Sequence, residues 1–326
     1  MRKKNRFTCF LCLTAALLSL CLGAARLSPA GVMEAILNGP RNTAGFIFWY
    51  VRLPRTLACL LAGSALAVSG AVIQGVLHNS LASPGIIGVN AGAGLAVTAC
   101  CAFGALSGWA IAGSAFLGAM VSVLLIVFTA EKVGASRTTV ILGGVAVNAF
   151  LNALSEALTT LIPEAGMMAA DFRVGGFGSV AYVRLIPSGI LIVLALIVLY
   201  TLHNQLDVLA LGEETAQGLG MDVRKVRTLL LILAAMLSGS AVSFAGLLGF
   251  VGLIVPHAVR KTAGSESRFL LPICAAGGGA FVTLCDTAAR MVFAPYELPV
   301  GILLSVLGGP FFLVLLIRRK GGRSHA

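Results

Sequence analysis

Apolar runs, most of them long enough to cross a lipid bilayer, recur along nearly the whole chain. They lie at about residues 7–25, 56–77, 86–106, 110–129, 139–160, 186–202, 228–248, 249–259, 270–290 and 298–317. A membrane-spanning helix needs about 20 apolar residues, and inside the bilayer every backbone polar group must be paired within the protein. Only 11% of the 326 residues are charged, against about 25% in soluble domains. The pattern predicts an all-α polytopic membrane protein with about ten transmembrane helices, forming a single transmembrane domain over residues 1–326.

Four places in this series need a specific interpretation. The run at 7–25 follows four basic residues, as in a signal peptide, but it exceeds the usual 7–15-residue apolar stretch and precedes further spans. It is therefore predicted to be the first span. Residues 26–50 are predicted to be an interfacial segment, with the second span starting at Thr56, and Ser83-Pro84 predicts the start of the third helix. The run at 249–259 is too short to span alone, so we expect it to extend into neighbouring residues or to be a half-helix shielded by protein.

One long polar interruption divides the chain, from Leu206 to Arg227. It carries acids first and basic residues last, and Gly212, Gly218 and Gly220 break it into short helical pieces. Such a segment cannot lie in hydrocarbon, so it must be in water at one membrane face. Short helical turns there are available to the groove of a partner protein.

The distribution of basic residues predicts the orientation. If the N-terminus, residues 130–138, the loop at about 204–227, residues 260–268 and the C-terminal tail share one side, that side holds every lysine and most arginines. The positive-inside rule makes this side cytoplasmic, with both termini inside. The net charge of +11 therefore reflects loop placement, and the basic residues are not clustered with aromatics as in a nucleic-acid-binding protein.

The basic residues that remain at the opposite side are all arginines. Interfacial snorkelling explains Arg26, Arg41 and Arg184. The planar guanidinium also suits bidentate binding of a carboxylate, and for Arg52, Arg55 and Arg290 we favour docking of an acidic partner. Asp286 lies four residues before Arg290, so these two can also neutralise each other.

A polar stripe marks the run at 139–160. Asn148, Asn152 and Glu156 follow one another at steps of four and share one helix face. Such groups are costly against lipid, so this face looks either at a water-filled path or at another helix through hydrogen bonds. Gly63, Ala67, Ala71 and Gly75 form a smooth face that predicts close helix–helix packing.

Enzyme motifs do not occur in the sequence. There is no phosphate-binding G-x-x-x-x-G-K-[ST] motif, so the chain does not hydrolyse ATP itself. No catalytic constellation and no set of residues with metal-ligand spacing appears, and we expect no cofactor in this chain.

Several long blocks resemble the permease subunits of bacterial ATP-binding-cassette importers for iron–siderophore, haem and cobalamin, the FecCD type. They include RLPR, HNSLASPGIIGVNAGAG, LGGVAVNAFLNAL, LALGEETAQGLG, GFVGLIVPHAVR and ELPVGILLSVLGGPFFLVLL, in the family's order over about residues 50–317. The resemblance implies a dimer of permeases, identical or paralogous, with two ATPase subunits that bind ATP and Mg²⁺ on the cytoplasmic face. It also implies an extracytoplasmic binding protein that delivers a metal chelate.

The resemblance implies roles for three groups of residues. The family's coupling segment to the ATPase matches residues 211–220, its outward docking arginines match Arg52, Arg55 and Arg290, and a helix lining its central path matches the one carrying Asn148 and Asn152. The chain departs from the family at Asn79-Ser80 and at Phe172–Phe177. The coupling residues are Leu211, Gly212, Glu213, Glu214, Ala216, Leu219 and Gly220.

The expected function is import of an iron chelate, most simply a ferric siderophore, across the bacterial cytoplasmic membrane. Haem or cobalamin are the alternative cargoes. An ion-coupled secondary transporter is a further alternative, for which Glu156 and Asp286 are the available ionisable groups within spans.

Overall fold

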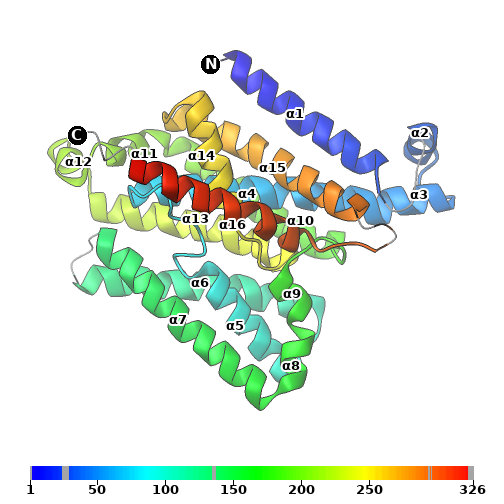
Figure 1. Ribbon diagram of the computed structural model, residues 1–326, viewed down its shortest axis with the longest axis horizontal. Helices are drawn as coiled ribbons and strands as arrows, with labels where there is room; N and C mark the ends of the chain where they lie inside the picture. The colour runs from blue at the N-terminus through cyan, green and yellow to red at the C-terminus, as the bar shows by residue number, and fades with distance from the viewer. Residues whose placement is uncertain (1, 24–28, 134–136, 293, 295, 322–326) are drawn as a thin grey trace.

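The computed structural model describes residues 2–23, 29–133, 137–292, 294 and 296–321, which form helices joined by turns and short loops (Figure 1). By length and composition, six helical stretches can each cross a membrane: Thr43–Val76, Gly108–Ala130, Thr138–Leu161, Tyr182–Thr201, Val223–Ala245 and Ser267–Val292. Three shorter apolar stretches lie in α1 (Arg2–Cys21), α5 (Val89–Ala102) and α16 (Val300–Gly321), and α14 (Val251–Ala263) is a further short helix. The prediction of an all-α membrane protein with about ten spans is confirmed.

Helix α4 (Leu53–Val76) lies at the centre of the bundle (Figure 1). It packs against α13 (Val223–Ala245), α14 and α15 (Ser267–Val292), while α1 covers α15. A second group, α5 with α6 (Gly108–Val133) and α7 (Arg137–Leu161), joins this centre through the contact of α6 with α13. The spans α4, α13 and α15 are therefore fixed to one another by packing.

The short helices gather at the two ends of the bundle (Figure 1). We call one the α12 end, where α11 (His203–Ala210) and α12 (Glu213–Gly218) lie, α1 begins and α16 ends. The other is the α9 end, which carries α2 (Pro29–Asn38), α3 (Thr43–Ile47), α8 (Pro163–Met168) and α9 (Ala170–Val174). The long spans therefore connect two ends of the bundle that carry different short helices and different side chains.

The predicted small-residue face of α4 is a close-packed seam. A Cβ on Gly63 would overlap the carbonyl of Gly278 on α15, and a Cβ on Gly278 would overlap the carbonyl of Gly63. About three turns further along α4, Gly75 faces the side chain of Leu206 on α11. The backbones therefore approach as closely as small residues allow, as in other membrane helix pairs.

The start of the second span differs from the prediction. Residues predicted to be a separate interfacial segment include α3 and the π-helical turn η1 (Phe48–Arg52), which run into α4 as one helix from Thr43. The Leu53 amide donates to the Phe48 carbonyl across the wider turn. Pro54, which lacks an amide hydrogen, falls just after this turn and at the start of α4, where it breaks no necessary hydrogen bond. Pro54 therefore does not end the preceding helix.

Two stretches of irregular backbone lie inside the bundle. The Ser83-Pro84 helix start is wrong: residues 80–88 form turns, Gly88 adopts φ +85°, and α5 begins only at Val89. Carbonyls of this stretch are satisfied from other helices, since Asn148 Nδ2 donates to the Gly85 carbonyl at 2.9 Å and Ser122 Oγ to the Gly88 carbonyl at 2.8 Å. The run predicted at 249–259 forms α14, a short helix of 13 residues that follows the non-helical residues 246–250 and extends to Ala263, so both alternatives hold in part. Such backbone is tolerated at membrane depth because protein covers it.

Candidate functional site

The polar interruption forms two short helices at the α12 end, as predicted. Gly212 has φ +116° and separates α11 from α12, and Gly220 has φ +82° beyond α12. Both conformations favour glycine, because a Cβ makes positive φ costly. The glycines therefore produce two sharp reversals that hold α12 as a distinct turn.

The predicted coupling residues divide into an outward and an inward set. Leu211 and Leu219 are 64% and 65% exposed, and Glu214 is exposed beside them. Ala216 is completely buried, and Glu213 is half-buried. Two large apolar side chains held out on a polar turn form a surface suited to the groove of another protein.

Each part of this segment is attached to a different span. His78, at the end of α4, places Nε2 2.8 Å from the Leu209 carbonyl. Asp207 accepts a hydrogen bond of 2.9 Å from the Ser267 amide, the first residue of α15. Glu213 forms an ion pair of 2.5 Å with Arg227 of α13. The segment is therefore fixed to α4, α15 and α13.

The start of α13 carries a second, exposed ion pair. Asp222 caps the helix by accepting from the Lys225 amide at 3.1 Å, and its carboxylate lies 2.9 Å from the Lys225 ammonium. The hydrogen bonds from Lys225 lower the pKa of the Asp222 carboxyl. With both side chains in water, this pair contributes little to stability.

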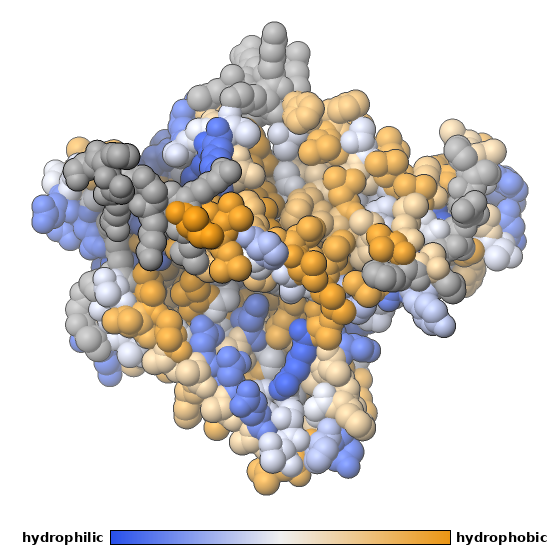
Figure 2. Space-filling model, viewed as in Figure 1, coloured by the Kyte–Doolittle hydropathy of each residue, from blue (hydrophilic) through white to orange (hydrophobic). Residues whose placement is uncertain are grey.

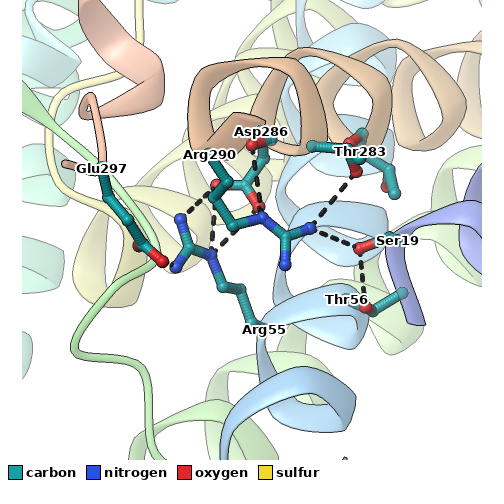
Figure 3. Close-up of polar contacts among 8 residues, drawn as sticks. Ser19, Arg55, Thr56, Thr283, Asp286, Arg290 and Glu297 are labelled. Carbon is teal, nitrogen blue, oxygen red and sulfur yellow. Dashed lines mark hydrogen bonds and ion pairs between the residues drawn. The ribbon is translucent and has the colours of Figure 1, made fainter. Parts of the chain in front are cut away.

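A buried charge cluster lies toward the α9 end, between α4 and α15 (Figure 3). Arg55 forms a bidentate pair with Asp286, with Nε–Oδ2 and Nη2–Oδ1 distances of 3.0 Å each. Arg290 Nε lies 3.1 Å from the same carboxylate. Asp286 has no exposed surface, so one buried acid neutralises parts of two buried arginines.

Hydroxyl and carbonyl groups complete the cluster. Arg290 Nη2 donates to Ser19 of α1 at 2.9 Å, and Ser19 lies 2.8 Å from the Thr56 hydroxyl (Figure 3). Arg52 donates to the Leu20 carbonyl at 2.6 Å. The three predicted docking arginines are thus brought together, and all three are buried.

Glu297 is the most exposed member of this cluster. Its carboxylate lies 2.6 Å from Arg55 Nη1, and its side chain is 42% exposed against 8% for Arg55. Both residues line a cavity of about 330 Å³ at the α9 end, together with Asp171, Gly176 and Phe177. The route from solvent to Arg55 therefore leads past an acid of the chain itself.

The polar stripe of α7 consists of one residue that is hydrogen-bonded within the protein and two that are exposed. Asn148 donates to the carbonyls of Gly85 and Ile86, so it serves as a structural hydrogen bond. Asn152 and Glu156 are exposed, and hydrophilic residues lie among hydrophobic ones over α7 (Figure 2). Only 17% of the most apolar 18-residue part of α7 is buried inside the protein, against 78% of the corresponding part of α13.

Sequence reasoning missed the partners of these groups. The Glu213–Arg227 and Arg55–Asp286 pairs join residues 14 and 231 positions apart, while Arg260 and Gln74 form a further hydrogen bond between α14 and α4. The i,i+4 spacing of Asp286 and Arg290 did signal their contact. The sequence spacing of the other pairs gives no sign that their side chains are in contact.

The helical bundle carries at one end a short polar turn with two exposed leucines, the kind of surface that a partner protein can bind. The chain belongs to the FecCD transport family, whose model matches residues 11–318.

Curated relatives match along almost their full length. The chain is 36% identical over 317 residues to the hemin transport system permease protein HmuU of Yersinia pestis, covering 94% of this chain and 95% of the relative. It is 34% identical over 304 residues to the Fe(3+)-citrate import system permease protein YfmE of Bacillus subtilis, covering 92% and 90%. It is 36% identical over 314 residues to the vitamin B12 import system permease protein BtuC of Salmonella typhi, covering 94% and 93%.

A solved structure agrees with this assignment. A metal-chelate type ATP-binding-cassette transporter in an inward-facing conformation superposes with a TM-score of 0.85 at 28% identity, covering 98% of this chain and all of that chain. The protein is therefore a multi-pass permease subunit of an ATP-binding-cassette transporter, and ATP hydrolysis belongs to a separate subunit.

Proposed function

We propose that this permease imports an iron chelate, most simply a ferric siderophore, as one of two permease subunits in a complex with two ATPases and an extracytoplasmic binding protein. The relatives are named for hemin, Fe(3+)-citrate and vitamin B12, so haem and cobalamin are the alternative cargoes. The α12 end then faces the cytoplasm with both termini, and the α9 end faces outward.

The observation that carries the proposal is the geometry of α12. The leucines that flank it, Leu211 and Leu219, offer apolar contact to an ATPase, and α11 and α12 together are tied to three spans. A force applied to this turn is therefore transmitted to the bundle and is not absorbed by a flexible loop. Alternating access then follows from rocking of the two permease copies against each other.

The exposed polar face of α7 supports a path between the two copies. Asn152 and Glu156 would be costly in lipid, but they are acceptable beside water or a second subunit. Asn148 joins this path only through its hydrogen bonds to residues 85 and 86. The proposed path contains few polar groups, as expected for a transporter in which the binding protein supplies the affinity for the chelate.

For Arg52, Arg55 and Arg290 we propose that acidic residues of the binding protein are received at the cavity beside Glu297. The local charge favours this, since three arginines face only two acids. Charge reversal at Arg55 does not test docking cleanly, because a glutamate would be buried against Asp286 and would destabilise the fold.

Replacement of Glu297 by glutamine tests docking at a solvent-accessible position. It releases Arg55 Nη1 from an internal acid, so binding-protein affinity should rise by roughly two- to fivefold, about 0.5–1 kcal/mol. Titration of labelled binding protein onto the permease in nanodiscs measures this. Glu164→Gln removes an exposed acid elsewhere at the α9 end and should leave affinity unchanged; an unaltered or weaker affinity for Glu297→Gln contradicts the docking assignment.

Transport in proteoliposomes tests the function itself. The permease, its ATPase and its binding protein are reconstituted, and uptake of a ferric siderophore, haem and cobalamin is compared in parallel. We expect ATP-dependent uptake of the ferric chelate that vanadate blocks and a protonophore does not. Uptake that survives vanadate but not the protonophore would identify a secondary transporter instead.

A further inference from the structure

Helix α13 touches both polar ends of the protein. It has 23 residues, a length of about 34 Å, and is among the most deeply buried of the long spans. At the α12 end it carries Arg227, whose side chain is only 6% exposed. Its packing against α4, α6 and α10 (Tyr182–Thr201) makes independent bending costly.

The inner end of α13 holds the ATPase-facing turn directly. Glu213 opens α12, and its carboxylate pairs with Arg227 at 2.5 Å. The other two attachments, at Leu209 and Asp207, belong to α11. Among the contacts described above, the Glu213–Arg227 ion pair is therefore the one that joins α12 itself to a span.

The outer end of α13 holds the loop of the α9 end through backbone hydrogen bonds. The Gly176 amide donates to the Ala245 carbonyl at 2.8 Å, and the Leu247 amide donates to the Phe172 carbonyl at 2.9 Å. The contact is tight, because a Cβ on Gly246 would lie 2.5 Å from the Phe172 carbonyl oxygen. Gly176 and Phe177 line the cavity that contains Arg55 and Glu297.

We propose that α13 is the strut through which the outer cavity and the ATPase contact influence each other, and that Arg227 is the positioning residue that fixes α12 to it. The proposal rests on the proposed function. A rigid helix bonded at both ends shifts the loop at 172–177 whenever α12 is displaced. The influence is reciprocal, so binding-protein docking alters the ATPase by the same route.

The test compares Arg227→Gln with Lys225→Gln in the complete transporter in nanodiscs. Both variants remove one cation from the first turns of α13, but Lys225 belongs to an exposed pair, with its side chain 85% exposed. The readout is the ratio of ATPase activity with and without loaded binding protein, with the amount of co-purifying ATPase as the measure of assembly. We expect Arg227→Gln to lower the ratio at least about fivefold and Lys225→Gln to leave it unchanged.

A charge swap separates coupling from folding. Glu213→Arg combined with Arg227→Glu should restore most of the ratio, because it re-forms the ion pair between α12 and α13 with its polarity reversed, while co-purification of the ATPase reports folding and assembly. If Arg227→Gln yields no assembled complex, Glu213→Gln, altered at the one-third-exposed partner, is judged by the same criterion.

The outcomes distinguish this inference from the proposed function. An assembled Arg227→Gln or Glu213→Gln transporter with the wild-type ratio overturns the strut, and so does a swap that leaves the ratio low. A wild-type complex whose ATPase ignores every loaded binding protein overturns the proposed function itself.

Discussion

Replacement of Asp286 by alanine is expected to destabilise the protein by about 3–5 kcal/mol. The aspartate is completely buried and neutralises parts of Arg55 and Arg290 at about 3 Å. Without it, two buried guanidinium groups remain side by side, and their repulsion adds to the cost of burying each charge. The expected result is a large loss of monodisperse protein in detergent and a lower midpoint of thermal unfolding.

Two further variants show whether charge is the cause. Glu297→Gln removes a half-exposed acid from the same cluster and should cost at most about 1 kcal/mol. Replacing Arg55, Asp286 and Arg290 together by apolar residues of similar volume should recover much of the stability, because no unpaired charge remains. An Asp286→Ala protein as stable as the wild type would show that the cluster does not hold α4 to α15.

The bundle could be predicted because the bilayer leaves few alternatives. Apolar length identifies the spans, and α6, α7, α10, α13 and α15 were predicted to within a few residues. Failures occurred where local signals depend on surroundings. The second span was predicted to start at Thr56, although a π-helical turn joins it to the helical residues before it, and Ser83-Pro84 was predicted to start the third helix, although Asn148 stabilises a non-helical backbone there.

The candidate sites could be predicted by residue type but not by pairing. Polarity alone places 211–220 in water, yet it does not distinguish the exposed Leu219 from the buried Ala216. The arginines were selected by their side of the membrane, but their burial depends on Asp286, which meets Arg55 only when α4 and α15 pack. Contacts between distant segments require the three-dimensional arrangement, so single-sequence periodicity cannot give them.

Replacement of both Leu211 and Leu219 by serine is expected to abolish uptake by preventing ATPase assembly. Each leucine is about two-thirds exposed in the isolated permease, and burial of a leucine in a partner groove contributes about 1.5–3 kcal/mol. Losing both should weaken ATPase binding by at least roughly 100-fold. The fold should be unaffected, because neither side chain belongs to the buried core; co-purification of the ATPase and the thermal midpoint of the permease measure the two effects separately.

The matched control is Leu211→Met with Leu219→Met, which keeps the apolar area and flexibility needed to fill a groove. This variant should bind the ATPase and transport nearly as well as the wild type. If the serine variant also retains the ATPase, α12 is held by its polar groups, and the exposed leucines are not the coupling surface. If both variants lose the ATPase, shape rather than apolar area determines the contact, since methionine keeps the apolar area of leucine but not its branched shape.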